Sequence, residues 1–412
     1  MMLDDQRFNN LMSNSACMFI LQLANFIVPF YVYNTISNII GLEYLGQYFY
    51  FIAYVYFIVT VCDFGLTITS LSKFSRVKFK SHYLSSVFCI KVALFLLSLL
   101  SLPLFWFVAE FSKISILFVV LSIFFQSLNP VWYFQSKERN GIIVVSGVVG
   151  RLLNFFVIFL FYEEIKTIEF FLFAYTLGVI IPFVVNLFFL EIDAKWPLRV
   201  DLRYIKSLMR LSLKTFKSRM ALTAYTSFNT FLIGALLGMQ YVSIYGMAEK
   251  IYQAGQGVVT PVSQVLFPFI SNKPDSKLFI KTVFIFMLIF IVGCLIIMTN
   301  TRFILEFLFN EIDDKAITLT RIYLFVSIIN AFSVFMGFPA FALFRDLITP
   351  NATVLYGACI YALLLPFSIL FFGYDLNIFV MIILIVEVSV LLMRVRKFNN
   401  MRKMAIENNV FF

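Results

Sequence analysis

The stretch TVFIFMLIFIVGCLIIM, from Thr282 to Met298, decides the fold class, because it holds seventeen residues in a row without a charge. A bilayer core about 30 Å thick is crossed by roughly 20 apolar residues in a helix. Lipid offers the backbone no hydrogen-bond partners, so a crossing segment must be a helix or part of a closed barrel. The unbroken apolar run excludes the alternating pattern of a barrel strand. The stretch therefore predicts a membrane-spanning helix.

Working outward from this stretch, similar apolar blocks occupy nearly the whole chain. Hydrophobic residues make up 61% of the sequence and charged residues 13%, against roughly 25% charged in ordinary soluble domains. We therefore expect an all-α integral membrane protein of about 12 transmembrane helices, with loops too short for a soluble domain. The eleven further expected spans are Leu11–Tyr33, Leu45–Leu71, Tyr83–Phe107, Ile114–Tyr133, Ile142–Tyr162, Phe170–Leu190, Met220–Leu237, Val242–Ile270, Arg321–Phe344, Asn351–Phe372 and Ile378–Met393.

The basic residues set the expected orientation. Of the 32 Lys and Arg, 24 fall in every second gap between spans, 5 in the other gaps and their edges, and 3 inside spans. The positive-inside rule places the 24-residue side in the cytoplasm, and with it both termini. The net charge of +10 is then explained by topology and anionic lipid, without nucleic acid. The five cysteines lie in apolar spans without metal-ligand spacing, and we expect no metal site.

The chain divides into two similar halves. We expect a six-helix lobe over 1–195, a cytoplasmic linker with an amphipathic surface helix over 196–219, and a second six-helix lobe with a basic cytoplasmic tail over 220–412. The segment Gly41–Tyr48 resembles Gly238–Tyr245, at the same place in each half. Six spans per half predict parallel repeats around a central cavity, where transporters place their substrate.

Several motifs then suggest a family. The sequence resembles the polysaccharide-transporter branch of the multidrug/oligosaccharidyl-lipid/polysaccharide exporter superfamily, in the same order along the chain. The motifs that carry the resemblance are Gly41–Gly65 ending in Val61-Cys62-Asp63-Phe64-Gly65, Pro130-Val131-Trp132-Tyr133-Phe134-Gln135, Tyr245-Gly246-Met247-Ala248-Glu249-Lys250 and Leu266-Phe267-Pro268-Phe269-Ile270-Ser271. Ser136 stands where the family pattern continues with Gly, which is a mild departure.

The resemblance implies a Wzx-type flippase of the bacterial inner membrane. Such proteins move undecaprenyl-pyrophosphate-linked sugar repeat units from the cytoplasmic to the periplasmic leaflet, for O-antigen or a related lipopolysaccharide or surface polysaccharide. The implied partners are this lipid-linked oligosaccharide, membrane lipids, the polysaccharide polymerase and the chain-length regulator. Nothing in composition or spacing alone names this substrate.

Charges inside the spans are the candidate substrate contacts, because a pyrophosphate cannot cross hydrocarbon unpaired. Asp63, Lys91 and Arg151 are expected in one layer, roughly 12–14 Å from the cytoplasmic boundary at 1.5 Å per residue. Arg151 and Lys91 would bind the substrate phosphates. The alternative is a structural ion pair of Asp63 with Lys91 or with Arg151. For Asp63 both an ion-coupling and a structural role stay open.

The second half offers a matching set. Glu249 and Lys250 are adjacent in an expected span and point apart on a helix, and Lys250 is the expected substrate contact. Glu387 lies near the middle of the last span and is a candidate protonation site, because burial favours the neutral form of a carboxyl group. A structural role is the alternative for Glu249 and Glu387. Arg219, at the cytoplasmic side, would guide the headgroup, or only hold topology.

No catalytic residue or cofactor is expected. The sequence holds no phosphate-binding loop of the type G-x-x-x-x-G-K-[ST], which excludes this route to ATP use. Coupling to membrane potential, protons or sodium is the expected energy source. The competing interpretations are a membrane enzyme, either a polysaccharide polymerase or an O-acyltransferase, and a drug or peptidoglycan-precursor exporter of the same fold.

Overall fold

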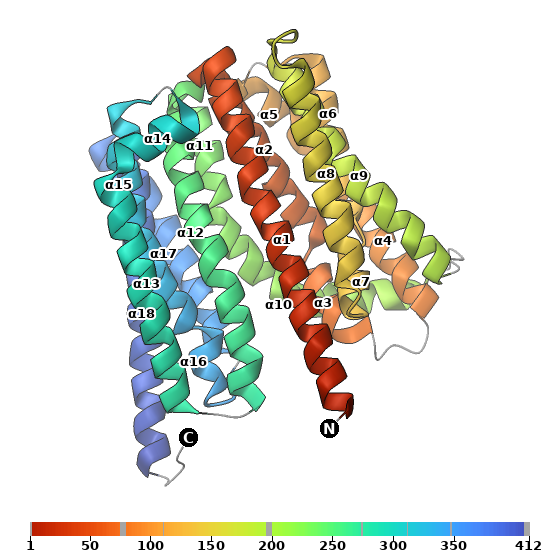
Figure 1. Cartoon of the computed structure of the whole chain (residues 1–412), viewed down its shortest axis with the longest axis vertical. Helices are drawn as coiled ribbons and strands as arrows, with labels where there is room; N and C mark the ends of the chain where they lie inside the picture. The colour runs from red at the N-terminus through yellow and green to blue at the C-terminus, as the bar shows by residue number, and fades with distance from the viewer. Residues whose placement is uncertain are drawn as a thin grey trace. The chain divides into compact units, whose positions relative to one another are not determined.

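The fold consists of helices joined by short connections (Figure 1). The structure is a computed structural model that describes residues 2–74, 80–109, 111–194, 200–272, 275–310, 312–346 and 348–407, and these ranges contain no strand. The elements are α1 (Met2–Ile39), α2 (Leu42–Asp63), α3 (Leu66–Lys73), α4 (Lys80–Ser98), the 3-10 turn η2 (Leu99–Ser101), α5 (Leu102–Ala109), α6 (Lys113–Leu128), α7 (Val131–Ser136), α8 (Asn140–Phe161), α9 (Ile168–Ala194), α10 (Leu202–Tyr225), α11 (Ser227–Leu237), α12 (Met239–Asn272), α13 (Ser276–Thr299), α14 (Thr301–Phe309), α15 (Asp314–Phe335), α16 (Phe338–Ala342), α17 (Thr349–Phe372) and α18 (Leu376–Glu407).

The expected spans all lie on helices, but some are divided in two, as Leu45–Leu71 is at Phe64-Gly65 and Arg321–Phe344 is at Met336-Gly337. The prediction of an all-α membrane protein is confirmed. Among the described residues nine helical stretches are long and apolar enough to cross a membrane, and the pair α10–α11, bent by 41°, would make a tenth. The other two expected spans lie on the long helices α1 and α12, which are not among these ten. In α12 the polar residues Glu249, Lys250, Gln253 and Gln256 interrupt the apolar sequence. Which side the termini face stays a prediction.

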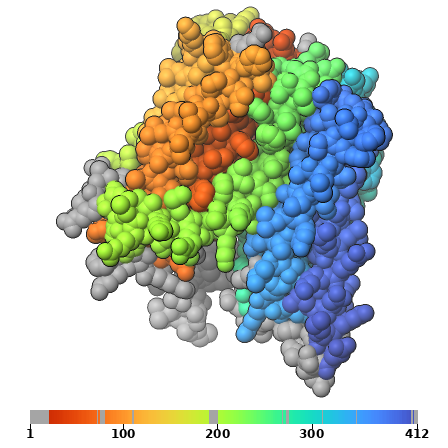
Figure 2. Space-filling view, turned by 180° about the vertical axis from the view of Figure 1, so that it is seen from behind, coloured from red at the N-terminus to blue at the C-terminus, as the bar shows by residue number. Residues whose placement is uncertain are grey.

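The helices form two compact units, Met1–Thr223 and Ala224–Phe412. The predicted lobe boundary at residue 195 lies outside the described residues, as do 196–199 of the predicted linker. Helix α10 takes up residues 202–219 of that linker together with Met220–Tyr225, and it belongs to the first unit up to Thr223. Leu208 and Ser212 of α10 are buried there, so this helix packs on protein as well as presenting an outer surface. Figure 2 shows α10 in yellow-green, crosswise below the orange helices of the same unit.

An aromatic cluster forms part of the core of the first unit. Trp132 on α7 is 1% exposed, and its ring meets that of Phe74 edge-on at 5.4 Å. Tyr83 at the start of α4 and Leu190 near the end of α9 belong to the same cluster. The motif Pro130–Gln135 is thus a packing motif, which joins the ends of four helical segments. Edge-on aromatic pairs stabilise such a junction by more than the burial of their apolar surface area alone.

The second unit is organised around α12, α15 and α18. Helix α15 packs against both of the others, and α17 packs against α18. One apolar cluster contains Val259 and Leu266 of α12, Phe335 of α15 and Phe279 of α13. The interior of this unit also holds buried charged side chains, among them Glu249, Glu387 and Arg394.

Candidate functional site

A break in the helix after Asp63 creates the charged site of the first unit. Helix α2 ends at Asp63 because Phe64 and Gly65 both adopt the left-handed conformation, with φ of 46° and 71°. A Cβ at Gly65 would lie 2.8 Å from the backbone nitrogen of Phe216 and 2.9 Å from the carbonyl oxygen of Ser212. Only glycine permits this approach of the α10 backbone. The motif ending in Asp63-Phe64-Gly65 therefore brings α10 against the carboxylate.

Two cations share the Asp63 carboxylate. Lys91 Nζ on α4 lies 3.0 Å from Oδ1, and Arg219 Nη1 on α10 lies 3.3 Å from Oδ2. The Thr67 hydroxyl also donates a hydrogen bond to Oδ1. The Lys91 and Asp63 side chains are 4% and 9% exposed, whereas that of Arg219 is 43% exposed. Of the two ion pairs considered for Asp63, the structure forms the one with Lys91. Arg219 is therefore the exposed cation of this cluster.

Arg151 lies apart from this cluster. Its Nε donates a hydrogen bond of 2.8 Å to Oδ1 of Asn25 on α1, and the side chain is partly buried. Among the described residues Arg151 forms no ion pair with an acid. The predicted layer of three charges is therefore brought together only in part: Asp63 pairs with Lys91, and no acid in the described ranges pairs with the Arg151 cation. This is the property a phosphate ligand requires, and its role as a substrate contact stays a prediction.

In the second unit Glu249 and Lys250 point to different surroundings. Glu249 is 5% exposed and accepts hydrogen bonds from the Thr230 hydroxyl at 3.1 Å and from Gln253. Lys250 is partly exposed, and its Nζ donates to Gln253 Oε1 at 3.1 Å. Glu249 thus connects α12 to α11, while Lys250 lies at the surface of the unit. This separation is what adjacent helical positions produce.

Glu387 is enclosed within the second unit rather than at its surface. It is 3% exposed and hydrogen-bonds to Asn330 on α15. The Asn330 Oδ1 accepts from Gln256 Nε2 of α12 at 2.7 Å, so Glu387 joins a chain of polar groups across three helices. A protonation role and a structural role are both compatible with this position, and both stay predictions.

Two buried polar centres were missed from the sequence. Arg394, expected among the cytoplasmic basic residues, is 8% exposed and bonds to the Ser333 carbonyl at 2.5 Å, to Thr353 Oγ1 at 2.9 Å and to the Pro350 carbonyl at 3.3 Å. It therefore ties α15, α17 and α18 together. The only sequence signal was its place directly after the apolar run of α18.

The second missed centre is a cluster of tyrosines and an asparagine. The Tyr323 hydroxyl donates to the Tyr245 hydroxyl at 2.5 Å, Asn229 Nδ2 donates to the same oxygen at 3.2 Å, and Tyr361 donates to Asn229. All four residues are buried. Tyr245 ends the repeated segment Gly238–Tyr245, and this repetition was the available signal.

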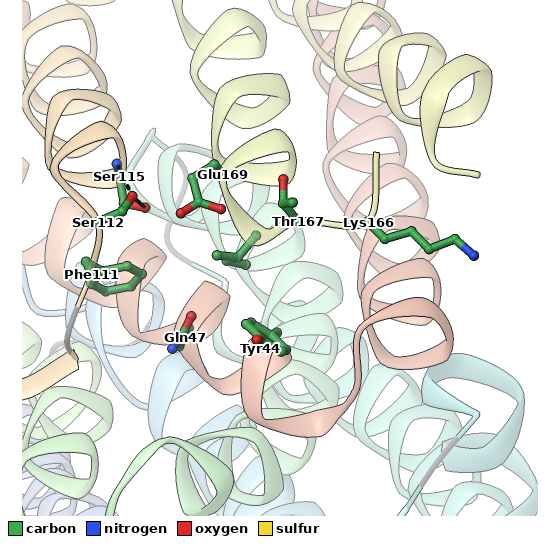
Figure 3. Close-up of a pocket in the computed structure, with 9 residues that line it drawn as sticks. Tyr44, Gln47, Phe111, Ser112, Ser115, Lys166, Thr167 and Glu169 are labelled. Atoms are coloured by element: carbon green, nitrogen blue, oxygen red, sulfur yellow. Dashed lines mark hydrogen bonds between the residues drawn. The ribbon is translucent and has the colours of Figure 1, made fainter. Parts of the chain in front are cut away.

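The first unit also contains a polar recess where α2, α6 and α9 begin (Figure 3). Its volume is about 370 Å³. Ser112 caps α6 by accepting a hydrogen bond from the Ser115 amide, and Figure 3 shows Phe111 and these serines close together at the left, with the side chains of Gln47 and Glu169 to their right. The lining residues are Tyr44, Gln47, Phe111, Ser112, Ser115, Lys166, Thr167, Ile168 and Glu169. The described residues hold no cluster of ligands suited to a metal ion.

Comparison with known proteins places this chain. The family described as polysaccharide biosynthesis protein matches residues 11–273, more than half of the sequence. The chain belongs to the polysaccharide biosynthesis protein family. A putative O-antigen transporter of Shigella dysenteriae is 24% identical to this chain over 269 residues, which is 63% of this chain and 67% of that protein. A putative O-antigen transporter of Escherichia coli K12 is 20% identical over 61% of this chain and 63% of that protein. The chain thus spans about two thirds of each relative in these matches.

Solved structures confirm the fold of this polysaccharide biosynthesis protein. The lipid II flippase MurJ in an inward closed conformation superposes with a TM-score of 0.73 at 15% identity, covering 94% of this chain and 87% of that one. An inward-facing multidrug resistance MATE family transporter gives 0.67 at 13% identity, covering 92% and 95%. The resemblance stated from the motifs is confirmed. The proteins that share this fold are named as a flippase and a transporter, and neither is named as an enzyme.

Proposed function

We propose that this family member is a flippase for undecaprenyl-pyrophosphate-linked oligosaccharide repeat units, acting in the bacterial inner membrane. It moves the polar headgroup from the cytoplasmic to the periplasmic leaflet for O-antigen or related surface polysaccharide synthesis. The observation that carries the proposal is the agreement of two independent likenesses. The family and the named O-antigen transporters support the proposed substrate class, and the likeness to a lipid flippase supports the fold.

The charges inside the spans fit an anionic headgroup. Arg151, Arg219 and Lys250 are partly exposed cations on helices of the membrane-spanning bundle. A pyrophosphate gains charge-assisted hydrogen bonds from such groups, and its desolvation is otherwise too costly. Lys91 is buried in its ion pair with Asp63. We therefore propose that it contacts the substrate only when that ion pair opens.

The proposed mechanism is alternating access. Two solved structures of similar fold are multidrug resistance MATE family transporters, one in an inward-facing and one in an outward-facing conformation, which supports a two-state cycle for this fold. Export of an anionic headgroup from a negative cytoplasm is favoured by about 2.3 kcal/mol per charge for each 100 mV. Membrane potential, with proton or sodium coupling, is therefore the proposed driving force. The polymerase and the chain-length regulator are the proposed downstream partners.

The test is deletion of the gene in its host and complementation with the wild type, Arg151→Ala, Arg151→Lys and Lys250→Ala. We expect the deletion to trap single repeat units on the carrier lipid at the cytoplasmic face, and the wild type to restore surface polysaccharide. Arg151→Ala should fail, and Arg151→Lys should restore part of the activity. Single units that reach the periplasm and are ligated without polymerising would instead identify a polymerase.

A further inference from the structure

Helix α12 exposes two faces of opposite chemistry. The first, here called the polar stripe, consists of Lys250, Gln253, Thr260 and Gln264, with Gly257 between them. Gln253, Thr260 and Gln264 are exposed and Lys250 is partly exposed. The second, here called the apolar stripe, consists of the exposed side chains Val258, Val265 and Phe269.

Helical geometry separates the two stripes. At about 100° per residue, the polar stripe falls within an arc of about 80°, and the centre of the apolar stripe lies about 120° from its centre. The third sector of α12, which includes Tyr245, Tyr252, Val259 and Leu266, is buried in the second unit. The polar stripe runs from Lys250 to Gln264, fifteen residues that span about 21 Å along the helix.

The two stripes require different surroundings within a membrane. Exposed valine and phenylalanine are suited to lipid chains, whereas exposed amide and hydroxyl groups in hydrocarbon lose their hydrogen bonds. Polar side chains in transmembrane helices accordingly face a bundle interior or a water-filled cavity. The apolar stripe therefore marks the lipid-facing side of α12, and the polar stripe marks a side that faces water.

The composition of the polar stripe selects one class of ligand. Glutamine and threonine side chains supply both donors and acceptors, as sugar hydroxyl groups do. The Lys250 Nζ donates a hydrogen bond to Gln253, and Gln253 also bonds to Glu249. The polar groups at the Lys250 end of the stripe are therefore connected by hydrogen bonds. Apolar drugs call for a mostly hydrophobic and aromatic wall, and a bound metal ion calls for carboxylates that the stripe lacks.

We propose that the polar stripe of α12 is a binding track for the sugar part of the transported headgroup. The neutral side chains Gln253, Thr260 and Gln264 hydrogen-bond sugar hydroxyls in succession, and Lys250 binds negative charge at one end. This inference rests on the proposed function and names a specificity-determining surface for it. Because neutral hydrogen bonds replace water one for one, the track guides the glycan without holding it tightly.

The first test is thiol accessibility along α12. The five native cysteines are replaced, and single cysteines are placed at Gln253, Thr260 and Gln264, with Val258→Cys and Val265→Cys as matched controls. Membrane vesicles open to reagent on both sides are treated with a charged, membrane-impermeant methanethiosulfonate. The vesicles come either from cells that make the lipid-linked repeat unit or from cells that lack its first sugar transferase.

We expect the stripe cysteines to react at least tenfold faster than the control cysteines, and the lipid-linked repeat unit to slow their reaction severalfold. Stripe cysteines that react no faster than Val258→Cys would show that this face is covered by protein, which overturns the proposal. Fast reaction that the repeat unit does not slow would show a water-lined face without glycan binding, and also overturns it. Complementation by wild type, scored in the same host, tests the proposed function separately.

A second test uses near-isosteric substitutions. We expect Gln253→Leu, Thr260→Val and Gln264→Leu each to lower the translocation rate about three- to tenfold, since each removes one or two neutral hydrogen bonds. Val258→Leu is the control and should leave the rate unchanged. Three variants with wild-type rates, at wild-type protein levels, would overturn the proposal while leaving flippase activity intact.

Discussion

The Lys91 ammonium on α4 lies 3.0 Å from the Asp63 carboxylate at the end of α2, and both side chains are more than nine-tenths buried. A buried charge that loses its partner is strongly destabilising, by about 3–5 kcal/mol. This pair therefore fixes the end of α2 against α4 at the point where the chain turns into α3. Its first role is structural, and any role in transport requires that it open.

Asp63→Asn should destabilise the protein by about 3–5 kcal/mol, because it leaves the buried Lys91 without its carboxylate. Lys91→Met should cost less, since Asp63 keeps Arg219 as a partner. The double variant should recover part of the loss. Thermal unfolding of the purified protein in detergent measures all three. Additive losses in the double variant would contradict the pairing.

Gly65→Ala should be more destabilising than Gly373→Ala. The two glycines have nearly the same φ, 71° and 73°, so the conformational penalty of roughly 1–2 kcal/mol is common to both. A Cβ at Gly65 would meet the α10 backbone at 2.8 Å, whereas nothing lies within 4 Å of one at Gly373. The difference should be about 1–3 kcal/mol. Equal shifts in unfolding temperature would mean that α10 does not hold this contact in the membrane.

Arg394→Met should lower the unfolding free energy by about 3 kcal/mol or more. The substitution leaves the carbonyls of Ser333 and Pro350 without their buried donor, and each orphaned group costs about 1–3 kcal/mol. Arg396→Met, two residues along the same helix but exposed, should change stability by no more than about 0.5 kcal/mol. Thermal unfolding in detergent distinguishes them. A neutral Arg394→Met would contradict the role assigned to this guanidinium.

Asp346, in the loop before α17, should give a stability that falls in acid. Partial burial alone would raise the pKa of Asp346, but hydrogen bonds from the Thr349 hydroxyl and from the Thr349 and Ile348 amides hold it below its usual range. The contribution is therefore fully present above the ordinary aspartate pKa, about 3.9. It is lost as pH falls through the lower pKa of the folded state.

Asp346→Asn keeps the shape of the side chain and removes its charge. The unfolding temperature of the wild type should exceed that of the variant at pH 7, and the gap should close as pH falls below about 4. Comparison of the two proteins from pH 7 to pH 3 in detergent provides the measurement. A gap independent of pH would assign the stabilisation to shape alone.

The helices were predictable because the composition of each segment is enough to indicate a helix. The run from Thr282 to Met298 lies entirely within α13, and the helix break at Phe64-Gly65 falls at the end of a motif already singled out. The adjacent charges Glu249 and Lys250 diverge as the period of a helix requires. Such features depend on composition and on period, which one sequence contains.

The tertiary partners of the charges were less predictable. Asp63 had two candidate partners, and only the folded chain shows that Lys91 and Arg219 are its neighbours. Arg394 was grouped with the basic residues that set topology, because a cation next to an apolar run has the same sequence context whether solvated or buried. The partners that bury it, Ser333 and Thr353, lie 61 and 41 positions away. Long-range packing decides such contacts, and spacing does not encode it.

The mixed character of α12 has a consequence for biogenesis. At the centre of a helix each Lys or Asp opposes insertion by the translocon by about 2.5–3.5 kcal/mol, and α12 carries Glu249 next to Lys250. The Thr230 partner of Glu249 is synthesised just before it, but Tyr323 and Asn330 on α15 emerge some seventy residues later. We therefore expect nascent α12 to leave the translocon paired with α11 and to settle only once α15 has arrived, so that the polar side chains that α12 buries set the order of assembly during translation.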